Sequence, residues 1–92
     1  MSVSPLSLSG SLTVDEAAAV LRATTAAIDA GCREIELGAL DTVDSSAVAT
    51  LLAIRRYADT KGVSLRFSPP PPALASLVGL YEVGGLLGLS AQ

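Results

Sequence analysis

The residues best suited to chemistry lie in one turn, Thr42-Val43-Asp44-Ser45-Ser46-Ala47-Val48, where an acid and two hydroxyls precede an expected helix. The first N–H groups of a helix lack partners within the helix and carry the positive end of its dipole. Asp44, Ser45 or Ser46 can therefore cap that helix. The position also accommodates a phosphate on a serine, which adds about −1.5 to −2 charges where anions are attracted. The residues alone leave both interpretations open.

The composition argues against catalysis and against a metal centre. The chain has no histidine, so the usual general base is absent. Cys32 is its single cysteine, and the two carboxylates Asp41 and Asp44 are far fewer ligands than a calcium ion takes. The glycines near the C-terminus are accompanied by neither the lysine nor the hydroxyl of a phosphate-binding loop. We therefore expect no enzymatic activity, no metal and no cofactor.

The charge pattern limits the classes of partner. Six Lys and Arg stand against nine Asp and Glu, and a net charge of −3 argues against binding to nucleic acid. Arg55 and Arg56 lie midway along an expected helix, where they either keep an exposed face solvated or take part in docking. No uncharged stretch reaches the roughly 18 to 20 apolar residues that span a bilayer, and no secretory signal pattern precedes residue 14. We expect a cytoplasmic protein.

Hydrophobic periodicity predicts the elements that position the turn. Thr13 and Glu16 form a capping box, and Gly31 and Gly62 supply left-handed stops. Strands are predicted at Pro5–Leu12, Glu34–Leu37 and Val63–Phe67, and helices at Val14–Ala30, Ser46–Thr60 and from Pro72 to the pair Gly84 and Gly85.

Three further details belong to this prediction. Val14 and Tyr81 are each assigned to the buried side of their helix. A turn through Asp41 and Asp44 is expected to join the second strand to the second helix. Strands that alternate with helices through short connections favour a parallel arrangement. The predicted fold class is α/β, a small mostly parallel or mixed sheet with helices packed on it, forming one domain over residues 1–92.

Three motifs, in this order and spacing, resemble the STAS domain family. They are the turn Val43-Asp44-Ser45-Ser46-Ala47-Val48 with its helix, the exit Lys61-Gly62-Val63-Ser64-Leu65-Arg66-Phe67, and Pro72-Ala73-Leu74-Ala75-Ser76-Leu77 running into Leu80-Tyr81-Glu82-Val83. The resemblance spans nearly the whole chain. It implies a non-catalytic module that binds another protein.

Within that family the Leu80-Tyr81-Glu82-Val83-Gly84 ending and the Ala-rich helices look most like one branch. It comprises the small cytoplasmic subunits of bacterial phospholipid-transport ABC transporters of the maintenance-of-lipid-asymmetry type. The resemblance implies that such a subunit binds the ATPase subunit, supports assembly and activity, and meets the membrane only through the complex. In that branch the hydroxyl directly after the turn aspartate, here Ser45, is the important one.

The alternative is an anti-sigma-factor antagonist, whose Asp-Ser-Ser-Gly motif is phosphorylated on its second serine by a kinase that is also the anti-sigma factor. Ser46 is the matching position, and Ala47 stands where that motif has glycine. Family members usually carry a further strand before the one expected at Pro5–Leu12. An uncovered strand edge pairs readily with another strand, so we also expect a homodimer through this edge.

Overall fold

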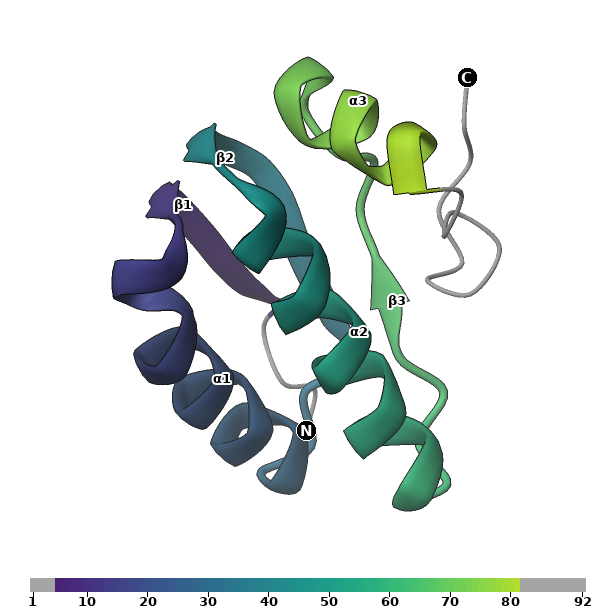
Figure 1. The fold of residues 1–92 in the computed structure, drawn as a ribbon. Helices are drawn as coiled ribbons and strands as arrows, with labels where there is room; N and C mark the ends of the chain where they lie inside the picture. The colour runs from purple at the N-terminus through teal and green to yellow at the C-terminus, as the bar shows by residue number, and fades with distance from the viewer. Residues whose placement is uncertain (1–4, 82–92) are drawn as a thin grey trace.

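The structure is a computed structural model that describes residues 5–81. The three strands in this range form a parallel sheet in the order β1-β2-β3. Helices α1 and α2 lie side by side against one face of the sheet, and α3 contacts β2 and α2 (Figure 1). This arrangement confirms the predicted α/β fold class. The elements are β1 (Leu6–Leu12), α1 (Val14–Asp29), β2 (Glu34–Val43), α2 (Ser45–Thr60), β3 (Arg66–Phe67) and α3 (Pro72–Tyr81).

The alternation of leucine and serine in β1 decides which face of the sheet is covered. Leu8 and Leu12 are buried, whereas Ser7, Ser9 and Ser11 are exposed. Side chains of a strand alternate between its two faces, so the leucines point toward the helices and the serines away from them. The core between sheet and helices is aliphatic, and its fully buried members include Leu12, Ile35, Leu37, Leu51, Ile54 and Leu74.

The second strand is longer than predicted and contains two irregularities. It continues past Leu37 to Val43, so Asp41 lies in the strand and the expected turn through Asp41 is wrong. In its ladder with β1, β2 contributes two more residues than β1 does, and the register shifts at two places. Gly10 of β1, at the second shift, has a φ of 73°. Each extra residue interrupts the two-residue period, which explains why Leu37 and Leu40 both reach the core.

The glycine stops are confirmed and explain why the third strand is shorter than predicted. Gly62 has a φ of 70° and donates to the Asp59 carbonyl, while Val63 donates to the Ala58 carbonyl at 2.8 Å. These two bonds close α2 in a Schellman motif. Because the Val63 N–H is used in this helix end, the strand expected from Val63 begins only at Arg66.

The ladder of β3 ends where the prolines begin. The Ser68 N–H donates to the Ile35 carbonyl at 2.9 Å, and the Ser68 hydroxyl accepts from the Leu37 N–H at 2.8 Å. Pro69 has no N–H with which to continue. Pro72 begins α3, as predicted. The expected end of that helix at Gly84 and Gly85 lies outside the described residues.

Two side chains that were assigned to buried helix faces are exposed. Val14 is 68% exposed and Tyr81 is 50% exposed. Val14 is the first residue of α1, and Tyr81 is the last residue of α3 in the described range. The prediction was therefore wrong at both positions.

Candidate functional site

The candidate site begins with the cap of α2. Asp44 has extended backbone angles, and its Oδ1 accepts a hydrogen bond from the Ser46 N–H at 2.8 Å. Of the three residues that the sequence offered as caps, Asp44 is therefore the one used. The carboxylate satisfies one of the N–H groups that a helix start leaves without a partner.

The same carboxylate also reaches the start of α1. Its Oδ2 accepts from the Val14 N–H at 3.3 Å, across thirty residues of sequence. Strands β1 and β2 are parallel, so the helices that follow them begin at the same edge of the sheet. Asp44 thus connects two helix N-termini and holds the exposed Val14 side chain next to the turn.

The two serines occupy different environments on the first turn of α2. Ser45 is exposed, whereas Ser46 is half-buried. The Ser46 carbonyl accepts from the Thr50 hydroxyl at 2.7 Å. Neither serine hydroxyl makes a hydrogen bond within residues 5–81. Both hydroxyls are consequently available to an external group, Ser45 with less steric restriction than Ser46.

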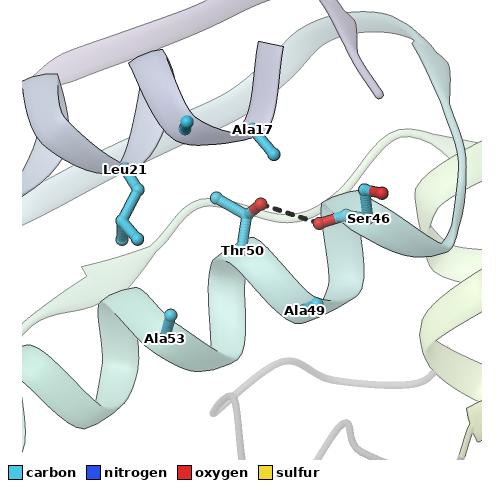
Figure 2. A pocket seen from close by; sticks show the side chains of 7 residues that line it. Ala17, Leu21, Ser46, Ala49, Thr50 and Ala53 are labelled. Atoms are coloured by element: carbon cyan, nitrogen blue, oxygen red, sulfur yellow. Dashed lines mark hydrogen bonds between the residues drawn. The ribbon is translucent and has the colours of Figure 1, made fainter. Parts of the chain in front are cut away.

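A shallow groove of about 310 Å³ runs between α1 and α2 from Ser46 onward. Figure 2 shows Ala17 and Leu21 of α1 on one side, and Ala49, Thr50 and Ala53 of α2 on the other. Alanines dominate this lining, and small side chains let the helices leave a recess where larger ones would fill it. The groove can receive an apolar side chain of a docked protein beside the turn.

Arg55 is held against the protein's own surface. Its guanidinium donates to the Leu65 carbonyl at 2.7 Å and lies 5.0 Å from the centre of the Phe67 ring. A charged donor on a carbonyl and a cation over a ring both stabilise the loop before β3. This geometry assigns Arg55 a structural role.

Arg56 is exposed and lies on the same stripe of α2 as Ser45. Ser45, Ala49 and Arg56 follow one another at four- and seven-residue steps, which place them on one side of a helix. Arg56 lies eleven residues after Ser45, which is about 16 Å along the helix axis. Arg56 therefore lies on the same face of α2 as Ser45 but well away from the turn.

Charged groups near the turn are acidic. Glu16 accepts from both the N–H and the hydroxyl of Thr13 at 2.8 and 2.7 Å. These hydrogen bonds lower the pKa of the Glu16 carboxyl, the side-chain bond contributing most.

No cluster of three metal-binding side chains occurs in the part of the chain that the structure describes. None of the helices described there is long and apolar enough to cross a membrane.

A protein-family model described as "Mlab, STAS domain" matches residues 2–88. The chain belongs to the STAS domain family. Members of this family are in general non-catalytic modules that mediate protein–protein interactions. Comparison with curated proteins and with solved structures finds no significant match. The α/β fold of the structure is consistent with this family.

Sequence reasoning did not identify two parts of this surface. Val14 was assigned to the core because it fits the apolar stripe of α1, and only its position as the first helical residue hinted at exposure. The groove depends on alanines from two helices that are far apart in sequence. The spacing of Ala49 and Ala53 from Ser46 was a usable signal on α2, but nothing in the sequence paired them with Ala17.

Proposed function

We propose that this STAS domain is the small regulatory and assembly subunit of a bacterial phospholipid-transport ABC transporter, and that it binds the ATPase subunit in the cytoplasm. The proposal is supported by the resemblance of the turn and of the Leu80-to-Gly84 ending to that branch, and by the description of the matching family model. The observation that carries it is that Asp44 joins the exposed Val14 to the first turn of α2, where Ser45 is exposed and Ser46 lines the groove.

The docking surface consists of the exposed first turns of α1 and α2 and the groove between them. Val14 supplies an exposed apolar contact, and Ser45 supplies a hydroxyl that has no hydrogen-bond partner among residues 5–81. The groove offers a recess lined by Ala17 of α1 and by Ser46, the neighbour of Ser45 on α2. An apolar anchor in a recess, flanked by a few polar groups, is the arrangement that contributes most of the binding energy in protein interfaces.

The test uses this chain and the transporter ATPase subunit from the same genome. Ser45→Glu adds charge and bulk beside Asp44, so we expect it to weaken binding by at least about tenfold, or ~1.4 kcal/mol. Ser45→Ala should still fold and bind. Ser64→Glu is the matched control, because Ser64 is exposed in the loop that follows α2, at the opposite end of that helix. Wild-type affinity of Ser45→Glu in calorimetry would refute this surface.

The second candidate is an anti-sigma-factor antagonist that is phosphorylated on Ser46. It is supported by the Ser46 hydroxyl, which has no hydrogen bond within the described residues and lies on the first turn of α2, where a phosphate is favoured. In this case the partner is a kinase, and Ser46→Glu should reduce binding more than Ser45→Glu. Incubation with that kinase and ATP, followed by mass spectrometry, would have to place the phosphate on Ser46.

A further inference from the structure

A second groove, which shares no lining residue with the groove between α1 and α2 and meets the docking surface only at the first turn of α1, runs along the outer edge of the sheet. It has a volume of about 460 Å³ and lies between β1 and α1. β1 is the terminal strand of the sheet in the described range, so one side of its backbone has no neighbouring strand there. The open N–H and C=O groups of such an edge bind another extended strand.

The shape of the groove suits the side chains of an added strand. Leu6 and Leu8 of β1 form its floor, and Ala19, Val20 and Ala23 of α1 form its roof. An added strand directs every second side chain toward the helices, where these residues would surround it. Gly10, which pairs with Leu40, has no side chain to occupy this space, and Leu40 also lines the groove.

The charges of the groove indicate what kind of strand it accepts. Among residues 5–81, its charged lining residues are Asp15 and Glu16, both on the first turn of α1. Glu16 is already engaged by Thr13, whereas Asp15 is exposed and has no ion pair within residues 5–81. A basic side chain at one end of the added strand would complement Asp15. β1 of a second copy has no lysine or arginine in Pro5–Leu12 and lacks this complement.

We propose that the groove between β1 and α1 binds an extended segment of a partner protein by strand addition. The segment alternates apolar and polar residues and carries a lysine or arginine that faces Asp15. Main-chain hydrogen bonds to β1 provide affinity, and the apolar side chains under α1 provide selectivity. The surface is separate from Ser45 and Ser46, so this inference does not depend on the proposed function.

The probe is a capped synthetic peptide of the same length as β1 that alternates valine and threonine, with a lysine at each end. Calorimetry on the full chain should show saturable binding, and amide NMR shifts should concentrate in Leu6–Leu12 and the facing side of α1. A peptide with glutamate in place of lysine should bind at least about tenfold more weakly. Absence of saturable binding, or shifts centred on Ser45, would overturn the proposal.

Two matched variants separate the groove from general effects on α1. Ala19→Lys places a long cationic side chain in the roof and should weaken binding of the lysine peptide by at least about tenfold. Ala26→Lys makes the same change at an exposed position of α1 outside the groove lining, and should leave affinity within about twofold. Equal effects of the two variants would contradict strand addition at this site.

Hydrogen exchange of the free full chain tests whether the chain itself or a second copy occupies the groove between β1 and α1. We expect the β1 amides that point away from β2 to exchange fast without the peptide and slowly with it. Slow exchange without the peptide at every protein concentration would show that this chain covers its own edge, and would overturn the proposal. Protection that appears together with a concentration-dependent dimer would assign the groove to a second copy and equally overturn it.

Discussion

Asp44 and Val14 are joined by a hydrogen bond from the Val14 N–H to Asp44 Oδ2, so that one carboxylate serves the first turns of two helices. Its other oxygen caps α2 through Ser46. The pair fixes the relative position of the two turns that form the proposed docking surface. A change at Asp44 therefore affects both the stability of α2 and the placement of Val14.

We predict that Asp44→Ala lowers the free energy of unfolding by about 1 to 2 kcal/mol, because it removes the cap of α2 and the contact with α1. Asp44→Asn should lose less, since its amide oxygen can still accept from Ser46. Urea denaturation measures both values. Asp41→Ala is the control, because Asp41 is exposed on β2 and caps no helix. An equal loss in Asp41→Ala would contradict the capping role of Asp44.

Thr24 provides a prediction about the core. Its side chain is fully buried on α1, and its hydroxyl has no hydrogen-bond partner within the described residues. Thr24→Val keeps the shape and removes an unsatisfied polar group, so it should raise the free energy of unfolding by about 1 kcal/mol. Thr25→Val is the matched control, because the Thr25 hydroxyl donates to the Arg22 carbonyl and should bring no gain. A destabilised Thr24→Val protein would show that this hydroxyl is satisfied in solution.

The capping box predicts a pH dependence of stability. Hydrogen bonds from Thr13 hold the pKa of Glu16 below its ordinary value of 4.5. A carboxyl whose pKa is lower in the folded state stabilises the fold above the unfolded value and loses that contribution as the pH falls through the folded one. Wild type should therefore be more stable than Glu16→Gln near neutral pH, and the difference should shrink below 4.5.

Urea denaturation at several pH values measures this difference. Glu36→Gln changes the net charge equally at an exposed position on the other face of the sheet, and it serves as the control. A gap between wild type and Glu16→Gln that stays constant down to acid pH would exclude the capping box as its cause.

The adjacent arginines should behave differently. Arg55→Ala removes a hydrogen bond to the Leu65 carbonyl and a contact with the Phe67 ring, and should cost about 1 to 2 kcal/mol of stability. Arg56→Ala should change stability by less than about 0.5 kcal/mol. Thermal denaturation distinguishes the two, and equal losses would contradict the structural assignment of Arg55.

For partner binding we expect the larger effect at Arg56 rather than at Arg55. Arg56 lies on the stripe of Ser45, so Arg56→Glu should weaken the complex while the domain stays folded. Arg66→Glu is the control of equal charge, because Arg66 pairs with Glu34 on the opposite face of the sheet and is 78% exposed. Unchanged affinity of Arg56→Glu would limit the docking surface to the first turns of the helices.

Most ends of the helices could be predicted from the sequence, because they depend on interactions between residues that are close along the chain. The capping box at Thr13 and Glu16, the glycine stops at Gly31 and Gly62, and Pro72 at a helix start each act within a few residues, so all four could be predicted. The sequence-based prediction ended the second strand at Leu37 because the alternation of apolar and polar side chains breaks after that residue. That break comes from extra residues opposite β1, which only strand pairing reveals.

The same distinction applies to the candidate site. The sequence located the turn from Asp44 to Ser46, because an acid and hydroxyls before an apolar helix are a local signal. Only tertiary structure decided that Asp44 also reaches Val14, that Val14 is exposed, and that Arg55 is held by Leu65 while Arg56 faces outward. These facts depend on which segments pack against one another in the folded chain, and residue spacing along the sequence does not specify that.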